Sequence, residues 1–475
     1  MEPIMFFKEV RHGWSLESTC ISLATTLGAA YILCAIFGAY FREITMKHRH
    51  GPYENQLKHS LIVLLLFAAA STGAIAAPDA QLQELIVEAA RNNPEIRAAS
   101  NERLAARHRV SPAGALDDPM LEAGVINAPL PDLRLNRDDM TMKMLGLSQK
   151  FPFPGKRDLR QAVAAKDAES VAYAYQETLN RVLRDVRVAY FELAFVVEST
   201  RLVEKNKQVL EQFLKISESR YAVGQGNQAD VLKAQTQLSR MADELIRLGR
   251  ERRVIEAELI RALGRESEAG APVPHALRLR EAPLQLEALR ETALRERPQL
   301  LGLRSLADRR GKALDLARKD YYPDFDVRLA YGQRDRAPDG VRRDDMLSFT
   351  VAINLPVWRE SKLDPQVAEA IAMRDQAMDM YQAQLNELSS KIRQQVANAE
   401  QSLKSTRLYE SGILPLARLT VESSLAAYRV NRVDFLTLLD NQMTVLNYEV
   451  NYASALSSYY KALAEIDLLT GKTLF

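Results

Sequence analysis

The feature that most constrains the fold is an internal duplication. Four landmarks recur in the same order along the 475 residues, at offsets of 204 to 207 positions. They are Asn93-Pro94-Glu95 with Arg297-Pro298-Gln299, Asp138-Asp139-Met140 with Asp344-Asp345-Met346, Phe151-Pro152 with Leu355-Pro356, and Tyr221-Ala222-Val223-Gly224 with Tyr428-Arg429-Val430-Asn431. The sequence therefore predicts two copies of one unit, at 77–264 and 286–471. A linker that contains Gly and Pro, at 265–285, joins them, and 472–475 form a short tail.

The N-terminal region has the pattern of a secretory signal peptide. Between Met46 and Ala76, basic residues precede the apolar run from Leu61 to Ala70, and the segment ends on Ala74-Ile75-Ala76. Small residues at these positions favour cleavage after Ala76, which would deliver the mature chain to the periplasm. An earlier apolar segment lies within 1–45. We interpret 1–45 as lying upstream of a true start at Met46, and the alternative is an extra membrane anchor.

Each copy switches its hydrophobic period from helix to strand and back to helix. In the second copy, apolar and polar residues alternate along two segments. The apolar positions are Phe325, Val327, Leu329 and Tyr331 in one segment, and Leu347, Phe349, Val351, Ile353 and Leu355 in the other. The first copy repeats this pattern more weakly, at Leu121, Ala123 and Val125 and then at Met140, Met142 and Met144. One β-hairpin per copy, set between helices, is the predicted arrangement, and the fold class is α+β.

The helices that follow the hairpins are unusually long. Between Asp158 and Tyr221 the chain has neither Pro nor Gly, and such a helix would reach about 95 Å at 1.5 Å per residue. Apolar residues at steps of three and four predict that each long helix pairs with its returning partner as an antiparallel coiled-coil hairpin. Pro415 interrupts the second copy alone, so we expect a helix break near Gly412.

The predicted strands have the length of strands that span a membrane. Four strands cannot close a barrel, and open sheet edges are not tolerated in lipid. Several chains would therefore have to share one barrel, and three chains would supply twelve strands. The alternative is a small soluble sheet beside a periplasmic coiled coil, in a structural or adaptor protein.

Composition excludes several classes of function. Lys and Arg number 63 against 61 Asp and Glu, a balance that argues against nucleic-acid binding. Beyond the N-terminal region the chain has no cysteine, and its histidines there are His108 and His275. We therefore expect no metal centre and no cofactor, and no phosphate-binding loop or catalytic triad indicates an enzyme.

The chain resembles the TolC-like outer-membrane efflux proteins, and within them the channels of heavy-metal efflux systems. The resemblance rests on the duplicated order of elements, on the segment from Gln149 to Arg157 (QKFPFPGKR), and on the segments 220–232 and 427–436. It implies a homotrimer with a twelve-stranded β-barrel in outer-membrane lipid, continued by an α-helical barrel through the periplasm. It also implies a periplasmic adaptor (membrane fusion) protein and an RND-type inner-membrane pump as partners.

The resemblance also implies roles for residues at the two helical turns. Adaptor docking would involve Gly224, Gln225, Gly226, Asn227, Asp230, Asn431 and Val433. A closed periplasmic aperture would involve Tyr428, Arg432 and Asp434, with Asp434 in a threefold carboxylate ring. Read without the resemblance, Gly224–Asn227 is a plain turn, and Asp230 and Asp434 are helix caps.

The predicted function is that of a passive exit duct. It would carry heavy-metal cations that the pump and the adaptor deliver. The alternatives are an exit duct of the same fold for multidrug efflux or type I secretion, and the soluble coiled-coil protein described above.

Overall fold

A computed structural model describes residues 80–130, 132–266 and 270–473. The chain divides into two units, Met1–Ala77 and Pro78–Phe475, and all described residues belong to the second. The predicted signal peptide and the segment upstream of it lie outside the described residues.

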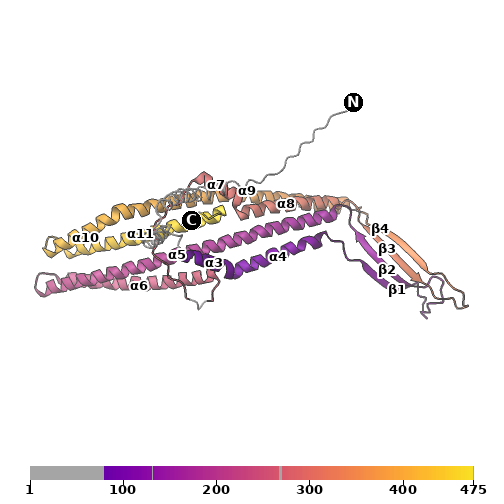
Figure 1. Cartoon of the computed structure of the whole chain (residues 1–475), viewed down its shortest axis with the longest axis horizontal. Coiled ribbons are helices and arrows are strands. Elements are labelled where there is room, and N and C mark those ends of the chain that lie inside the picture. Colours follow the sequence, from indigo (N-terminus) through magenta and orange to yellow (C-terminus); the bar gives the residue numbers. More distant parts are fainter. Residues whose placement is uncertain (1–79, 131, 267–269, 474–475) are drawn as a thin grey trace, which may run out of the picture. The chain divides into compact units, whose positions relative to one another are not determined.

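The described unit repeats one order of elements twice (Figure 1). The first copy consists of α3 (Ala80–Asn92), α4 (Pro94–Gly114), β1 (Met120–Ile126), β2 (Met142–Phe151), α5 (Lys156–Ala222) and α6 (Gln228–Leu263). The second consists of α7 (Leu286–Glu296), α8 (Pro298–Lys319), β3 (Phe325–Gln333), β4 (Met346–Ile353), the π-helical turn η1 (Arg359–Leu363), α9 (Asp364–Leu408), the π-helical turn η2 (Tyr409–Ile413), α10 (Leu414–Arg429) and α11 (Phe435–Thr470). The α+β class and the helix–hairpin–long-helix order are as predicted.

The duplication extends to the way helix ends pack. Gly264 ends α6 and Gly471 ends α11, both with positive φ, at 71° and 72°. A Cβ on Gly264 would lie 2.8 Å from the Cα of Asn93, and one on Gly471 would lie 2.8 Å from the carbonyl oxygen of Glu296. Asn93 separates α3 from α4, and Glu296 ends α7. Each copy therefore closes its last helix against the break between its two short ones, and each contact requires a glycine.

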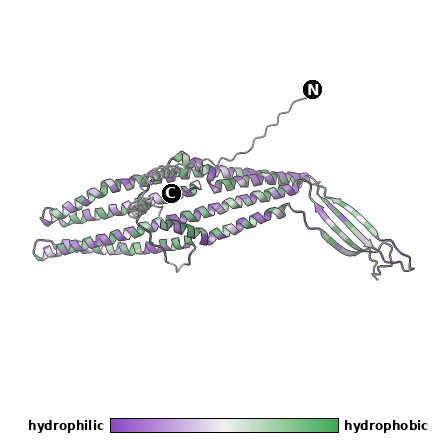
Figure 2. Cartoon of the chain, viewed as in Figure 1, coloured by the Kyte–Doolittle hydropathy of each residue, from purple (hydrophilic) through white to green (hydrophobic). Residues whose placement is uncertain are grey.

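The strands of both copies form one antiparallel sheet in the order β1-β2-β3-β4. Pairing of β2 with β3 joins the copies, with Leu147 opposite Leu329. One face of the sheet is apolar and exposed, and Figure 2 shows hydrophobic and hydrophilic residues alternating along the strands. Its exposed residues are Leu121, Val125, Leu145, Leu147, Leu329, Tyr331, Leu347, Phe349, Val351 and Ile353.

Two strand boundaries differ from the prediction. Strand β2 begins at Met142 and not at Met140, because the backbone N–H of Met140 donates to the Asp138 carboxylate (2.7 Å) in a turn. Strand β4 ends at Ile353, so Leu355 lies outside it. There the side chain of Asn354, and not its backbone carbonyl, accepts from the backbone N–H of Asp324, so a side-chain bond replaces one of the two ladder hydrogen bonds of this pair.

The long helix α5 runs through 67 residues without interruption, as predicted. The α-helix is interrupted near Gly412, as predicted, but the chain does not leave the helix: α9 passes into α10 through the π-helical turn η2. Pro415 cannot donate to the preceding turn, and its ring would collide with the carbonyl four residues earlier. Widening one turn to a π-helix accommodates the proline without ending the helix.

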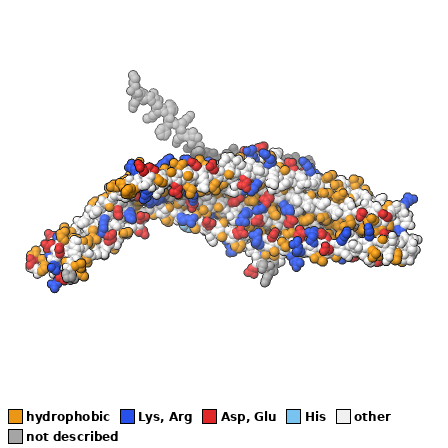
Figure 3. Space-filling view, turned by 180° about the vertical axis from the view of Figure 1, so that it is seen from behind, with side chains coloured by type: hydrophobic (Ala, Val, Ile, Leu, Met, Phe, Trp, Pro, Cys, Tyr) orange, Lys and Arg blue, Asp and Glu red, His pale blue; other side chains and the backbone are white. Residues whose placement is uncertain are grey.

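The hydrophobic core lies between the long helices and contains fully buried side chains such as Tyr190, Leu193, Leu263 and Leu463. On the face shown in Figure 3, acidic and basic side chains are interspersed over the helices, in line with the near-balance of charge. None of the helices in the described part of the chain is long and apolar enough to cross a membrane.

Candidate functional site

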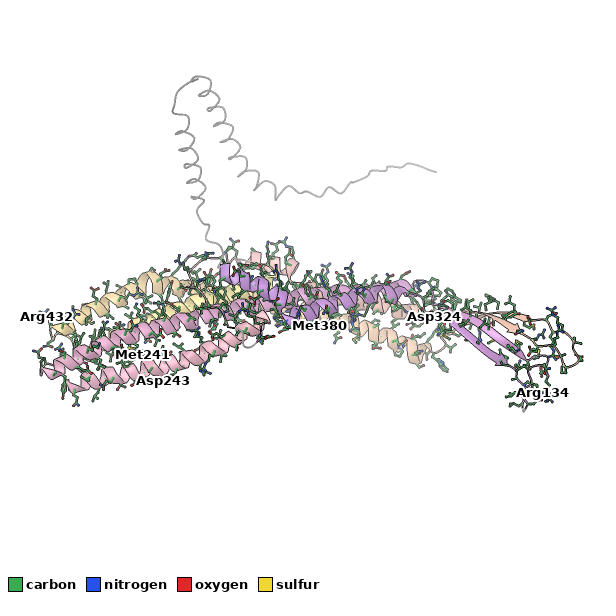
Figure 4. All side chains as sticks on the ribbon, turned by 60° about the horizontal axis from the view of Figure 1, so that its bottom comes forward. Arg134, Met241, Asp243, Asp324, Met380 and Arg432 are labelled. Atoms are coloured by element: carbon green, nitrogen blue, oxygen red, sulfur yellow. The ribbon has the colours of Figure 1, made fainter. Side chains whose placement is uncertain are left out.

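The predicted site residues cluster at the two turns that join the long helices. We call the turn between α5 and α6 with its flanking helix ends, 220–230, the first tip, and the turn between α10 and α11 with its flanking helix ends, 427–437, the second tip. The two tips lie at the same end of the helices, and the sheet lies at the other end (Figure 1). Figure 4 accordingly places Arg432 and Asp324 far apart.

Both tips use the same backbone motif. In the first, the N–H groups of Gly224 and Gln225 donate to the carbonyls of Tyr221 (3.0 Å) and Arg220 (2.9 Å). In the second, Asn431 and Arg432 donate to Tyr428 (3.2 Å) and Ala427 (2.9 Å). Gly224 and Asn431 both have positive φ, at 71° and 61°. This is the Schellman pattern that ends a helix, so the duplication preserves the turn geometry.

The helix caps that follow the tips are only partly those predicted. Asp434 caps α11, with its carboxylate accepting from the Thr437 N–H at 2.9 Å. Its counterpart in the first tip is Asn227, whose side chain accepts from the Ala229 N–H at 3.2 Å. The prediction that Asp230 is a cap is therefore wrong, because Asp230 lies inside the first turn of α6. At that position the negative charge of Asp230 still stabilises α6, because it lies near the positive end of the helix dipole.

The two equivalent tyrosines have different environments. Tyr428 is 4% exposed and packs against Phe435, with ring centroids 5.7 Å apart, whereas Tyr221 is 49% exposed. Burial raises the pKa of Tyr428 above its ordinary value. The second tip therefore has an aromatic anchor that the first tip lacks.

Arg220 connects the two tips. Its guanidinium donates to the Tyr428 carbonyl (2.6 Å) and to the Asn431 side chain, and its central carbon lies 4.6 Å from the centre of the Tyr428 ring. It also donates to the Gln225 carbonyl (3.3 Å). One arginine of the first copy thus contacts backbone, amide and ring of the second copy.

Sequence reasoning missed this role of Arg220. A position-by-position comparison of the two copies does single out Arg220, because Arg220 precedes Tyr221 whereas Ala427 precedes the equivalent Tyr428. Arg432, the arginine that the resemblance indicated, is exposed, and its side chain forms no hydrogen bond or ion pair with the other described residues. Its part in an aperture stays a prediction.

The remaining predicted docking residues are accessible in this chain. Gly224, Gln225, Asn227 and Asn431 are exposed, and Gly226, Asp230 and Val433 are half-buried. Hydrogen bonding to Thr437 holds the pKa of Asp434 below its ordinary value, so this carboxylate is ionised at neutral pH. A cation approaching the second tip would meet that charge.

The segment that carries the resemblance lies where the sheet meets the helices. Phe153 stacks on Tyr322, with centroids 4.6 Å apart. Lys156 is 2% exposed; its ammonium group donates to the Asp324 carboxylate (2.8 Å) and the Tyr322 carbonyl (3.0 Å). Burial opposes ionisation of Asp324, but hydrogen bonds from Lys156 and the Phe153 N–H hold the pKa of Asp324 below its ordinary value. The motif thus joins the two copies at the sheet.

Within 80–130, 132–266 and 270–473, no group of three or more His, Cys, Asp or Glu side chains is placed to hold a metal ion. What the geometry offers is a pair of joined helical tips at one end and a sheet with an exposed apolar face at the other.

Known proteins share the fold that carries these joined helical tips and this sheet with its exposed apolar face. Residues 85–265 match the family profile described as "Outer membrane efflux protein". The cobalt-zinc-cadmium resistance protein CzcC of Cupriavidus metallidurans is 24% identical over 367 residues, which cover 74% of this chain and 84% of CzcC. Among solved structures, VceC of Vibrio cholerae (TM-score 0.70, 18% identity, 84% of this chain and 97% of VceC) and CusC (TM-score 0.71, 15% identity, 83% of this chain and 92% of CusC) have the same fold.

The fold and the matched segment define an outer-membrane efflux channel. Residues 85–265 carry the profile of the outer-membrane efflux proteins, and the fold is that of the solved outer-membrane proteins; the predicted location in the outer membrane agrees with both. The prediction that the chain is not an enzyme agrees with the efflux-protein profile over residues 85–265. The predictions of family, fold class and efflux function are confirmed.

Proposed function

We propose that this chain is the passive exit duct of a heavy-metal efflux system. The observation that carries the substrate class is the alignment with a cobalt-zinc-cadmium resistance protein over most of both chains. In this proposal an RND-type inner-membrane pump and a periplasmic adaptor protein deliver the cations. The duct supplies a path and no energy.

The proposed channel is a homotrimer. In the described sheet, β1 and β4 are edge strands, and the exposed apolar face suits contact with lipid hydrocarbon. Because unpaired strand edges are costly in lipid, pairing of β4 of one chain with β1 of the next would remove them. Three sheets of four strands would then close a twelve-stranded barrel.

The tips would form the periplasmic mouth. Adaptor docking is assigned to Gly224–Asn227, Asp230, Asn431 and Val433, which are accessible in the single chain. The aperture is assigned to Tyr428, Arg432 and Asp434, and Arg220 would hold the first tip against the second within each chain. Release of that contact would let the tips separate.

The carboxylate ring can be tested without disturbing the helix cap. Asp434→Asn removes the charge, and an amide at this position can still accept from the Thr437 N–H. In planar bilayers, D434N should weaken block of the reconstituted channel by divalent cations, whereas Asn227→Ser, which alters the uncharged cap of the first tip, should not. Equal block of wild type and D434N would contradict the ring.

A growth-inhibition panel tests the substrate class. A strain that lacks this chain should become sensitive to salts of cobalt, zinc or cadmium, and expression of the wild-type chain should restore tolerance. A panel of drugs is the control. Sensitivity to drugs without sensitivity to metals would overturn the heavy-metal assignment and favour a multidrug duct.

Fractionation and native mass measurement test the assembly. The protein should be recovered from outer membranes with three times the mass of the mature chain. A soluble monomer in the periplasmic fraction would overturn the channel and favour the coiled-coil alternative.

A further inference from the structure

The face of the sheet opposite the exposed apolar one carries a group of methionines. Met144 lies opposite Gly332, and Gly332 lies opposite Met346, so these three residues form one row across β2, β3 and β4. Met142 precedes Met144 by two residues and therefore shares its face. Because the central position of the row is a glycine, methionines surround a spot that has no side chain of its own.

Gly332 provides the floor of this spot. A Cβ on Gly332 would lie 2.5 Å from the sulfur of Met142 and 3.3 Å from its Cγ. The Met142 thioether thus occupies the space that any other residue at 332 would fill. Residues directly opposite each other on adjacent strands have Cβ atoms about 5 Å apart, so the side chains of Met144 and Met346 start on either side of Gly332.

These methionines are not ordinary core residues. Methionine often fills gaps in a hydrophobic core, where it is buried. Here Met142 and Met144 are only half-buried, and Met346 is 42% exposed. The face also carries the ion pair between Arg328 and Glu122, and an Arg328 nitrogen lies 4.0 Å from the Met144 sulfur. The thioethers therefore lie on an accessible, polar face of the sheet.

We propose that Met142, Met144 and Met346 form a binding site for a soft monovalent cation, Cu⁺ or Ag⁺, above Gly332. Neutral thioether sulfur prefers soft cations, whereas Zn²⁺ and Co²⁺ prefer imidazole, carboxylate or thiolate ligands. The nearby charges of Arg328 and Glu122 offset each other, so the ion would be held by sulfur. Binding involves one chain alone; a role in export rests on the proposed function.

Titration of the purified mature chain with Ag⁺ tests the site directly. The test variant is M142L/M144L/M346L, because Leu keeps the volume and removes the sulfur. The control is M378L/M380L, which removes two exposed thioethers from α9. We expect calorimetry to show one Ag⁺ per chain in wild type and control, and at least a tenfold loss of affinity in the test variant. Equal Ag⁺ affinity in all three proteins would overturn the site.

A second readout follows the sulfurs themselves. With ¹³C-labelled methionine methyl groups, Ag⁺ should shift the NMR signals of Met142, Met144 and Met346 and leave those of Met378 and Met380 in place, and Zn²⁺ should shift neither set. Shifts of Met378 and Met380 alone would contradict the proposal.

Growth assays separate this inference from the proposed function. The triple variant should lower tolerance to silver and copper while leaving tolerance to zinc, cobalt and cadmium as in wild type. A deletion strain that tolerates every metal would overturn the heavy-metal duct, whereas the Ag⁺ titration would still decide the site. Equal tolerance of triple variant and wild type to silver would overturn a role of the site in export.

Discussion

The two tips share a backbone and differ in their side chains. Each ends a helix with a residue of positive φ, Gly224 or Asn431, and each begins the next helix with a side-chain cap, Asn227 or Asp434. Only the second tip buries its tyrosine, and only the first supplies an arginine to the other. Duplication thus preserved the turn, which depends on few residues, while the side chains diverged to make the tips complementary.

Replacing each of the two equivalent tyrosines should give the largest difference in stability between the two tips. Tyr428→Ala empties a buried site and should lower the free energy of unfolding by about 3–5 kcal/mol. Tyr221→Ala removes a half-exposed ring and should cost about 0.5 kcal/mol or less. Denaturant melts of both variants would measure the difference, and equal losses would contradict the assigned environments.

Unlike the tyrosines, the equivalent glycines Gly264 and Gly471 should lose the same amount of stability when each is replaced. Alanine at either position must adopt positive φ and approach backbone atoms at 2.8 Å. Each variant should be destabilised by about 1–3 kcal/mol. Gly249→Ala is the control: it lies inside α6 with open space around it, so it should stabilise the chain by up to about 1 kcal/mol. A loss in only one copy would contradict the duplicated packing.

Acid should weaken the second tip more than the first. The folded-state pKa of Asp434 lies below its ordinary value, so the stability it adds is present above that ordinary value and is lost as pH falls through the folded pKa. Asn227 does not titrate. Hydrogen exchange at the Thr437 amide should therefore accelerate on acidification relative to the Ala229 amide, after correction for intrinsic rates. Asp434→Asn should abolish this pH dependence, and its persistence in D434N would assign it to another group.

The sequence predicted the parts of this fold that depend on local pattern. The long helices follow from the apolar spacing and the absence of Pro and Gly in 158–221, and the strands of the second copy follow from strict alternation. Pro415 predicted the interruption near Gly412 but not its form, because a π-helical turn can accommodate the proline without ending the helix and composition does not indicate that choice. Asp230 was mistaken for a cap because Asp is a good cap in general, whereas the turn geometry placed Asn227 there.

The sequence pattern could not predict contacts between segments that lie far apart in the chain. Arg220 and Tyr428 are 208 residues apart, and only the folded chain shows that one contacts the other. The methionine row likewise depends on strand register, which brings Met144, Gly332 and Met346 together. Tertiary pairing therefore decided both the tip contact and the proposed cation site.

The most direct test of the duct is the conductance of the purified chain in planar bilayers, compared with that of Arg220→Ala. Loss of Arg220 removes the contact between the tips, so R220A should show clearly higher conductance than wild type. Arg240→Ala, at an exposed position on α6, is the matched control and should behave as wild type. Equal conductance of wild type and R220A would contradict closure by this contact, and no conductance from any of the three proteins would contradict the duct itself.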